Sequence, residues 1–421
     1  MKSHRESTQA LVIGGGPAGA ATAWALASQG IDVVLADKAT FPRDKPCAEY
    51  LSPQASRILS AMGVLDAVEL AGAAQLHGMR VRSPDGGIIH GEFAAKHGFS
   101  GFRDRGLALR RRHLDPILLQ AARGAGASIR EGTALHSLIM LGEAVVGARL
   151  RIGQGIHEIR APLVIGADGL RSTVARQLNL TARTLWPRRV AFVAHFRDVS
   201  GIGAYGEMHV ERDGYVGLAD VGHGETNVAL VVPKALAKEA RGDAAGFMTR
   251  WLARHSQLAL RFAAATRVSD VRATGPFASH ARCGFAAGAA LVGDAADFFD
   301  PFTGEGIYAA LRGGELLGEF AADAIRQRMP RKACAALKAY DTARANEFRN
   351  KWLVERAIGA AVSSPLLMNH AARVLGARPD LADLLVGVTG DFVPAGAVLA
   401  PSFLMHFLDP RRWRASTRKA A

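Results

Sequence analysis

A glycine-rich turn between two apolar segments constrains the fold of this chain more than any other feature. Residues 11–13 (Leu-Val-Ile) predict a buried strand, and the pattern Gly-x-Gly-x-x-Gly follows at positions 14–19. An alanine-rich helix is expected from residue 18 to about residue 28. A second strand is expected over residues 31–35, and Asp37 follows it. This order of strand, turn, helix, strand and acid is the order found in parallel sheets that bind a dinucleotide.

Each glycine of the turn has a mechanical role in this interpretation. Gly14 permits the sharp turn, Gly16 lets a pyrophosphate approach the backbone, and Gly19 lets the helix pack closely on the strand. The helix N-terminus offers free N–H groups and partial positive charge to the phosphates. Asp37 is placed to accept hydrogen bonds from a ribose. We therefore predict dinucleotide binding; a glycine-rich turn in another kind of α/β protein is the alternative.

Length and charge set broad limits on domain number and partners. The 421 residues suggest two or three domains, and the formal net charge of +14 comes from 52 basic and 38 acidic residues. The arginines are scattered and no DNA- or RNA-binding motif accompanies them, so we expect no nucleic-acid partner. Most of the charge is interpreted as solvated surface, with attraction to an anionic membrane surface as the alternative.

Cysteine usage and hydropathy indicate the compartment. Cys47, Cys283 and Cys334 form an odd set without metal-ligand spacing, which argues for a reducing compartment and against a disulfide framework or a metal site. No apolar run reaches the roughly 18 residues of a membrane-spanning helix, so no transmembrane segment is expected. We predict a cytoplasmic protein, with peripheral contact to a membrane as the alternative.

Two further strand ends carry motifs that match the first one. Residues 166–169 (Gly-Ala-Asp-Gly) follow a buried strand, and residues 293–294 (Gly-Asp) follow another. Residues 301–306 (Pro-Phe-Thr-Gly-Glu-Gly) then open a long helix. Ligands of an open parallel sheet bind beyond the carboxyl ends of its strands, so three such ends imply one long ligand. Ordinary helix capping at each place is the alternative.

The same segments carry a resemblance to a known family. GGGPAG (14–19), RRHLD (111–115), GADGLRS (166–172) and GDAADFFDPFTGEGI (293–307) resemble the FAD-dependent monooxygenase superfamily with the p-hydroxybenzoate hydroxylase fold. PRDKPCAEYLSP (42–53) and DPFTGEGIYAALRGGEL (300–316) are more similar to its geranylgeranyl reductase and halogenase-related branch. The similarity spans residues 11 to about 320.

The resemblance implies FAD as cofactor, with NAD(P)H as a transient electron donor. By this resemblance the glycine turn and Asp37 hold the ADP half of FAD, and Arg111 lies near its pyrophosphate. Asp168 belongs to a motif associated with FAD and NAD(P)H. Residues 293–294 hold the ribityl chain, and residues 301–306 line the flavin ring. The free N–H groups of residues 304–306 would stabilise the reduced ring by roughly 0.3–1 kcal/mol. The implied cofactor-binding residues are Gly14, Gly16, Pro17, Ala18, Gly19, Asp37, Lys38, Arg111, Asp168, Gly293, Asp294, Pro301, Gly304, Glu305, Gly306 and Ile307.

Two departures from the family patterns decide which reaction we expect. Cys47-Ala48-Glu49 stands where the reductase branch reads Cys-Gly-Glu, and residues 215–220 (Tyr-Val-Gly-Leu-Ala-Asp) lack its Tyr-x-Trp-x-Phe-Pro. The Gly-Trp-x-Trp-x-Ile-Pro segment of halogenases is absent from the sequence. We therefore expect an NAD(P)H- and O2-dependent monooxygenase that hydroxylates an apolar, aromatic or polyketide-like small molecule. A reductase of C=C bonds in a prenyl or lipid substrate is the alternative. A non-enzymatic flavin-binding protein at a membrane surface is the third interpretation.

Three residues are catalytic candidates. By resemblance to the reductases Cys47 is a flavin-proximal thiol, and Arg43 or Lys45 beside it would lower its pKa. His195 lies in a predicted sheet that covers the substrate, where an imidazole can act as acid or base. Tyr215 is expected to line the same pocket. An inert loop cysteine, a structural histidine and a packing tyrosine are the alternatives.

The expected fold is α/β (α+β), with a Rossmann-type FAD-binding domain, a substrate domain built on a mixed or antiparallel sheet, and a C-terminal helical segment. We assign residues 1–74, 94–180 and 276–330 to the discontinuous FAD-binding domain. Residues 75–93 and 181–275 form the substrate domain, and residues 331–421 form the helical segment.

Overall fold

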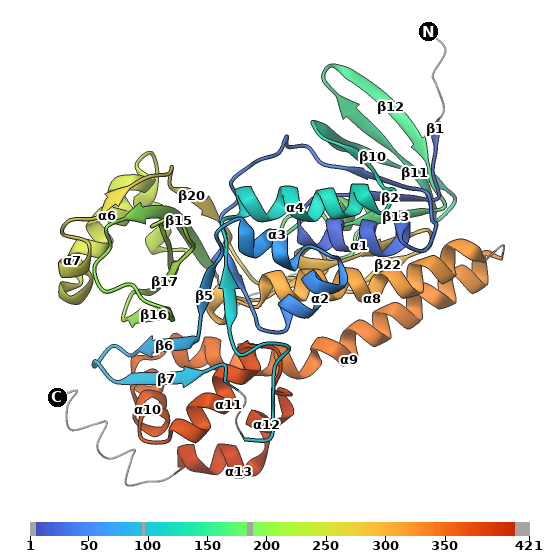
Figure 1. Ribbon diagram of the computed structural model, residues 1–421. Coiled ribbons are helices and arrows are strands. Elements are labelled where there is room, and N and C mark those ends of the chain that lie inside the picture. Colours follow the sequence, from blue (N-terminus) through green and yellow to red (C-terminus); the bar gives the residue numbers. More distant parts are fainter. Residues whose placement is uncertain (1–5, 95–96, 183–187, 328, 409–421) are drawn as a thin grey trace.

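The computed structural model describes residues 6–94, 97–182, 188–327 and 329–408, and Figure 1 labels many of its helices and strands. The parts of the expected domains at residues 1–5, 95–96, 183–187, 328 and 409–421 lie outside these ranges. The expected α/β class with a Rossmann-type sheet is confirmed. The domain boundaries stay a prediction.

A six-stranded sheet carries the glycine turn. Its order is β22-β23-β13-β2-β3-β9, parallel except for the edge strand β22. The strands are β2 (Ala10–Ile13), β3 (Val33–Ala36), β9 (Ser128–Arg130), β13 (Leu163–Gly166), β22 (Phe285–Ala286) and β23 (Ala289–Leu291). The four central strands β2, β3, β13 and β23 are buried on both faces, and their sequences accordingly contain only apolar residues and glycine.

Side chains alternate along each strand, so they contribute to two separate hydrophobic cores, one on each face of the sheet. Val12, Leu35 and Ile165 point to a helical layer, whereas Leu11 and Val34 point to an antiparallel meander. The helical layer is α1 (Pro17–Ala27), α2 (Ala55–Ala61), α3 (Leu65–Leu70), α4 (Arg111–Gly124) and α8 (Gly306–Arg326). The meander is β10 (Thr133–Leu141), β11 (Ala144–Ile152) and β12 (Gly155–Arg160), extended by β1 (Glu6–Ser7) and flanked by α5 (Thr173–Gln177) (Figure 1).

Helices α1 and α8 pack closely because small residues line their contact. A Cβ on Gly314 would lie 2.8 Å from the carbonyl oxygen of Ala18, and one on Gly318 would lie 2.5 Å from the Cβ of Ala25. Both distances are shorter than real side chains allow. The two helix N-termini are thereby held on the same side of the sheet.

A second, mostly antiparallel sheet has the order β19-β15-β18-β17-β16-β6-β7, with β20 also paired to β15. Its strands are β6 (Gly78–Arg82), β7 (Ile88–Glu92), β15 (Arg189–Arg197), β16 (Gly206–Glu211), β17 (Gly214–Asp220), β18 (Thr226–Pro233), β19 (Thr266–Arg267) and β20 (Arg272–Thr274). One face packs on α6 (Ala244–Arg254) and α7 (Ser256–Arg261). The other face packs on the C-terminal helices.

The C-terminal helices lie beneath the β6–β7 hairpin (Figure 1). They are α9 (Pro330–Val362), α10 (Pro365–Gly376), α11 (Pro379–Thr389), α12 (Gly396–Leu399) and α13 (Pro401–Leu404). Short strands join the two lobes: β4 (Tyr50–Leu51), β5 (Ala74–Leu76) and β8 (Gly106–Ala108) form one small sheet, and β14 (Thr181–Ala182), β21 (Ser279–Ala281) and β24 (Asp297–Phe298) form another. Within the described ranges, no helix is long and apolar enough to cross a bilayer.

Candidate active site

A cavity lies where the two sheets approach each other. One side of its wall comes from the glycine turn and the loop at 45–48. The same side also includes Ala167, Gly169, Leu170, Pro301, Phe302, Gly304, Gly306 and Ile307. The other side is the inner face of the second sheet, where small and apolar side chains predominate. The predicted cofactor residues Gly16, Pro17, Ala18, Arg111, Asp294, Pro301, Gly304, Gly306 and Ile307 all line it.

The glycine turn has the geometry that the sequence pattern predicts. Gly14 has a φ of 111°, and a Cβ there would lie 2.3 Å from the carbonyl oxygen of Ala167. A Cβ on Gly19 would lie 1.8 Å from the carbonyl oxygen of Gly14. Only glycine fits at either position. No side chain caps the N-terminus of α1 at Gly16, so the helix end is open to the cavity.

The start of α8 presents a second open helix end to the same cavity. Gly304 is left-handed with a φ of 75°, and Glu305 occupies the N-cap position without a side-chain cap bond. The preceding Asp300 fixes this loop, because its carboxylate accepts hydrogen bonds from Tyr215 Oη at 2.6 Å, Phe302 N at 3.1 Å and Arg189 Nη1 at 2.7 Å.

Two cations lie between these helix ends. Arg111 is held by a bidentate bond to Asp115 at 2.6 and 2.9 Å, and its Nη2 lies 3.5 Å from the Cβ position of Gly16. Lys45 lines the cavity and makes no hydrogen bond or ion pair to the described part of the chain. Burial lowers the pKa of Lys45, as does nearby Arg111, while burial raises the pKa of Asp294 opposite.

These features fit FAD. A dinucleotide needs N–H donors and cations at its diphosphate and a source of positive potential at the flavin ring edge, and two open helix ends with Lys45 and Arg111 provide them. The assignment of single residues to parts of FAD stays a prediction.

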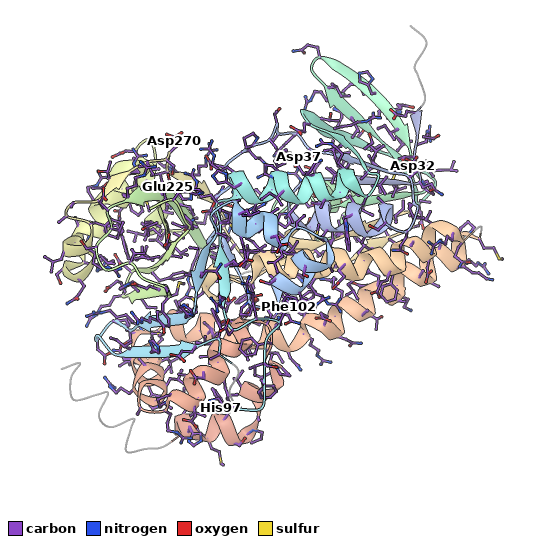
Figure 2. All side chains as sticks on the ribbon, in the orientation of Figure 1. Asp32, Asp37, His97, Phe102, Glu225 and Asp270 are labelled. Atoms are coloured by element: carbon purple, nitrogen blue, oxygen red, sulfur yellow. The ribbon has the colours of Figure 1, made fainter. Side chains whose placement is uncertain are left out.

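Four predicted cofactor residues place their side chains elsewhere. Asp37, which follows β3 (Figure 2), accepts hydrogen bonds from Gly15 N at 2.6 Å and Ala39 N at 2.7 Å, so its carboxylate fixes the turn. Asp168 accepts from Thr173 N at 2.6 Å at the start of α5. Neither carboxylate lines the cavity, and Lys38 is exposed. The side chain of Glu305 lines a different cavity, together with Gly293.

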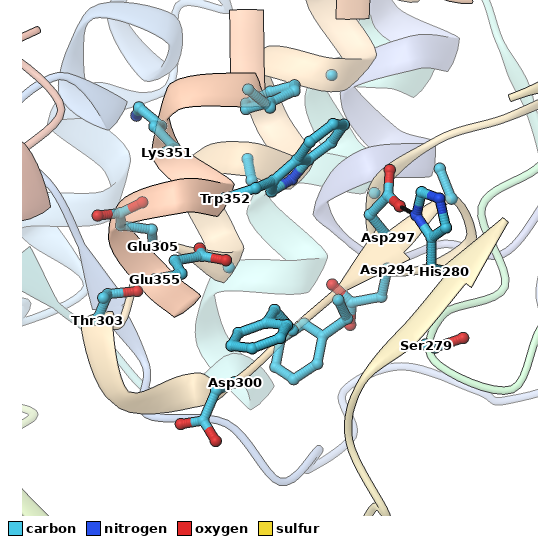
Figure 3. A pocket seen from close by; sticks show the side chains of 18 of the residues that line it. Ser279, His280, Asp294, Asp297, Asp300, Thr303, Glu305, Lys351, Trp352 and Glu355 are labelled. Carbon is cyan, nitrogen blue, oxygen red and sulfur yellow. Dashed lines mark hydrogen bonds and ion pairs between the residues drawn. The ribbon is translucent and has the colours of Figure 1, made fainter. Parts of the chain in front are cut away.

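The second cavity lies between residues 293–306 and α9. Figure 3 shows Glu305, Glu355 and Lys351 together on one side of it. Lys351 forms an ion pair with Asp391, whose side chain is fully buried. Burial raises the pKa of Glu305 well above its ordinary value and raises that of Glu355 to about 8, although Lys351 opposes both shifts. Three carboxyl groups thus share one ammonium group, and at neutral pH the cluster retains a proton.

The three catalytic candidates have different surroundings. Cys47 and Tyr215 line the main cavity, whereas His195 does not and instead places its Nε2 2.7 Å from Glu49 Oε2. Burial raises the pKa of the Cys47 thiol more than Arg111 lowers it, so the lowered pKa expected from Arg43 and Lys45 is not found. Burial also raises the pKa of Tyr215, and Asp300 adds to the shift.

Sequence reasoning missed several residues of the site. In the sequence, Lys45 stands out only as a neighbour of Cys47, and Glu49 only as part of the Cys-Ala-Glu motif. Asn227, whose side chain bonds both Glu49 Oε2 and the Cys47 carbonyl oxygen at 2.9 Å, carries no sequence signal. The strand pairing that sets Asn227 opposite His195 is visible only in the structure.

A third, apolar cavity adjoins the main one, and we call it the apolar chamber. It shares Met79, Met208 and Phe302 with the main cavity. Apart from Thr303 and Thr389 its wall is apolar, with further residues from the C-terminal helices: Ile358, Ala361, Val362, Met368, Ala371, Leu375, Leu385 and Val386. Gly206 makes room for Met79 at the junction, since a Cβ there would lie 2.5 Å from the Met79 sulfur.

Comparison with known proteins agrees with this geometry. A family model described as an FAD binding domain matches residues 7–349. The chain belongs to this family. It is an FAD-dependent oxidoreductase. Digeranylgeranylglycerophospholipid reductase 2 of Methanopyrus kandleri is 29% identical over 91% of this chain and 93% of its own length. Digeranylgeranylglycerophospholipid reductase of Methanosarcina acetivorans is 31% identical over 75% of each chain.

Solved structures share the fold at lower identity. A flavoprotein/dehydrogenase from Cytophaga hutchinsonii has a TM-score of 0.80 at 21% identity, over 98% of this chain and all of its own. A myxobacterial chondrochloren halogenase has a TM-score of 0.77 at 23% identity, over 84% and 82%. A geranylgeranyl bacteriochlorophyll reductase-like protein from Thermoplasma acidophilum has a TM-score of 0.72 at 21% identity, over 98% of both chains.

The two cations predict how FAD affinity responds to mutation. Lys45→Gln removes a charge that faces the cavity, so we expect the Kd for FAD to rise about 10- to 100-fold, the range for a lost charged hydrogen bond. Lys38→Gln, a matched change at an exposed lysine, is expected to leave the Kd within about twofold. Titration of the apoprotein with FAD, followed by flavin fluorescence, measures both. Equal weakening by the two changes would contradict this placement of Lys45.

The buried carboxyl cluster predicts a pH dependence of stability. Because the folded state holds the Glu355 proton up to about pH 8 and the unfolded chain releases it near pH 4.5, the folded state binds more protons between these values. This group therefore makes the free energy of unfolding fall as pH rises, by up to about 1.4 kcal/mol per pH unit.

Glu355→Gln should flatten that part of the profile, measured by urea denaturation from pH 5 to pH 8. Glu319→Gln, at an exposed position of α8, is the control and should retain the wild-type slope. An unchanged slope in Glu355→Gln would show that the cluster does not hold the proton.

Proposed function

We propose that this FAD-dependent oxidoreductase reduces C=C bonds in a prenyl or similarly long apolar lipid chain. The observation that carries the proposal is the apolar chamber, which continues the main cavity past Met79, Met208 and Phe302. Such a chamber suits a long hydrocarbon chain and offers an aromatic ring with polar substituents almost no hydrogen-bonding partner. The reductases among the relatives support the same reading.

The sequence alone favours hydroxylation over the reduction of C=C bonds, and this proposal reverses that preference. The absence of the reductase pattern at residues 215–220 affects the shape of the cavity wall. Gly217 and Ala219 stand on the inner face of β17 and line the cavity, so this wall is wide where the reductase branch has larger side chains. We interpret the departure as a change in the shape of the substrate cavity and not as a change of reaction.

The residues of the cavity have distinct proposed roles. Bound FAD, once reduced, supplies a hydride. The apolar walls hold the alkene and exclude water. Cys47 donates its thiol proton to the second carbon of the double bond; the raised pKa of this thiol keeps it protonated at neutral pH. Tyr215 positions the flavin loop through Asp300.

Donor and location complete the proposal. We propose NAD(P)H as a transient electron donor. A cytoplasmic protein that takes its lipid substrate at a membrane surface agrees with the net charge of +14.

The decisive experiment compares turnover with and without oxygen. Chemically reduced protein is mixed with a geranylgeranyl lipid under anaerobic conditions, and the product is analysed by mass spectrometry. We expect a gain of two hydrogen atoms per reduced bond without O2. A product that forms only with O2 and contains an added oxygen atom would overturn the proposal in favour of hydroxylation. Cys47→Ala should abolish reduction, whereas Cys334→Ala, a half-buried cysteine on α9, should not.

Filling the apolar chamber should change the preferred chain length. Ala361→Phe adds a ring to the chamber wall, so kcat/KM for a geranylgeranyl substrate should fall roughly tenfold or more, while a short geranyl substrate is affected much less. Ala357→Phe, one turn earlier on α9 and exposed, is the matched control. Equal losses for both chain lengths would show that the distal part of the substrate does not enter the chamber.

A further inference from the structure

Exposed apolar side chains gather on two short segments of the C-terminal helices, the first turn of α10 and the end of α13 with the 3-10 helix η4 (Met405–Leu408). Each of them is between 41% and 76% exposed. A single exposed apolar residue is ordinary on a protein surface, whereas a group of them marks a contact site. We call this group the apolar patch, and it consists of Leu366, Leu367, Leu404, Met405 and Leu408.

A hydrogen bond joins the two segments of the apolar patch. His370 Nε2 lies 2.8 Å from the carbonyl oxygen of Phe407, and the two rings are 6.4 Å apart. Residues three and four apart on a helix are neighbours, so Leu366 and Leu367 lie one turn from this contact. Phe407 belongs to the same short helix as Met405. The patch therefore forms one surface, at the end of the molecule remote from the β10–β12 meander (Figure 1).

Helix α10 stands between the apolar patch and the apolar chamber. Met368, Ala371 and Leu375 line the chamber. At 3.6 residues per turn these three fall on a different face of α10 from the two leucines of the patch. A helix with its side chains is about 10–12 Å across. A surface that meets the patch would therefore lie about one helix diameter from the chamber.

The sequence that follows the apolar patch is strongly basic. Residues 409–421 read Asp-Pro-Arg-Arg-Trp-Arg-Ala-Ser-Thr-Arg-Lys-Ala-Ala, with five basic residues and one acidic residue. Basic residues beside an apolar surface are attracted to anionic lipid headgroups, and tryptophan is enriched at membrane interfaces. Arg373 and Arg378, on α10 and just after it, are each paired with an aspartate. The excess of positive charge next to the patch thus comes from residues 409–421.

We propose that the apolar patch and the basic sequence after it dock this protein on an anionic lipid membrane. The inference rests on the proposed function and deepens it, because it names the surface that meets the source of the substrate. The patch side chains enter the boundary between headgroups and acyl chains, and the basic residues pair with headgroup phosphates. The strength of such binding grows with the apolar area buried and with the attraction to anionic lipids. Docking holds the apolar chamber beside the layer that supplies a prenyl chain.

Flotation with lipid vesicles tests the docking without any turnover. The FAD-loaded protein is mixed with vesicles of phosphatidylcholine and phosphatidylglycerol in equal amounts, or of phosphatidylcholine alone, and the bound fraction is measured. We expect the Kd to be about tenfold or more lower with the anionic vesicles at low salt. This preference should disappear at about 1 M salt, where the screening length is about 3 Å. Equal binding to both kinds of vesicle, or no binding to either, would overturn the proposal.

Substitutions in the apolar patch test its contribution. The triple variant Leu367→Gln, Met405→Gln, Leu408→Gln should raise the Kd for anionic vesicles about tenfold or more, because three apolar side chains no longer enter the membrane. The matched control replaces three exposed leucines of other elements by glutamine and should stay within about twofold of wild type: Leu70, Leu141 and Leu260. Equal weakening by the two sets would contradict this placement of the docking surface.

Substitutions in the basic sequence test the electrostatic contribution. The triple variant Arg411→Gln, Arg412→Gln, Arg414→Gln should raise the Kd for anionic vesicles about tenfold or more and leave binding to phosphatidylcholine alone unchanged. The matched control makes the same change of net charge at three exposed arginines of the other lobe and should stay within about twofold of wild type: Arg241, Arg267 and Arg272. Equal losses would show that the net charge of the whole protein drives binding, which would overturn the proposal.

A second copy of this chain is the competing occupant of the apolar patch. Analytical ultracentrifugation of the wild type and of the patch variant measures the oligomeric state of each. We expect the same state for both. A wild-type dimer that becomes monomeric in the patch variant, with vesicle binding retained, would make the patch a dimer interface and overturn the proposal.

Turnover separates the docking from the proposed reaction. With a geranylgeranyl lipid embedded in anionic vesicles, the patch variant should need about tenfold more vesicles for half-maximal turnover. Turnover of the same lipid in detergent micelles should stay within about twofold of wild type, and equal losses in vesicles and micelles would contradict docking. A wild-type protein that floats with anionic vesicles and reduces no alkene would retain the docking and remove the proposed function.

Discussion

The whole site depends on the way α1 and α8 are held side by side with their N-termini open to one cavity. The two helices lie near opposite ends of residues 7–349, the range that the family model matches. They pack closely because Gly314 and Gly318 on α8 have no side chain to separate them from α1. Their fixed separation sets the distance between two sources of positive potential. A cofactor with a diphosphate at one end and a redox-active ring at the other matches such a pair.

The cofactor half of the site was predictable because its signals are local in sequence. The turn at 14–19, with a strand before it and a helix after it, needs no tertiary information, and the structure gives Gly14 and Gly19 the close backbone contacts that the pattern implies. The direction of side chains was not predictable. Glu305 belongs to a flavin-loop motif, yet its carboxyl group turns toward Lys351 and away from the main cavity.

The surroundings of the catalytic candidates Cys47 and His195 could not be predicted, because they depend on burial and strand register, which no single motif encodes. The positive neighbours of Cys47 predict a lowered thiol pKa, but burial dominates and raises it. Glu49, His195 and Asn227 come from three segments of the chain and meet only because β15 pairs with β18 in one register. The apolar chamber likewise depends on how amphipathic helices after residue 349 pack against the second sheet.

The apolar chamber and the predicted cofactor-binding residues are formed largely by different parts of the chain. The wall of the apolar chamber includes Ile358, Ala361 and Met368, which follow residues 7–349, the range that the family model matches. None of these three residues lines the main cavity, so substitutions at them change the shape of the apolar chamber alone. The size and shape of the chamber can therefore vary through single substitutions on the C-terminal helices, while the open N-termini of α1 and α8 keep their own sequences.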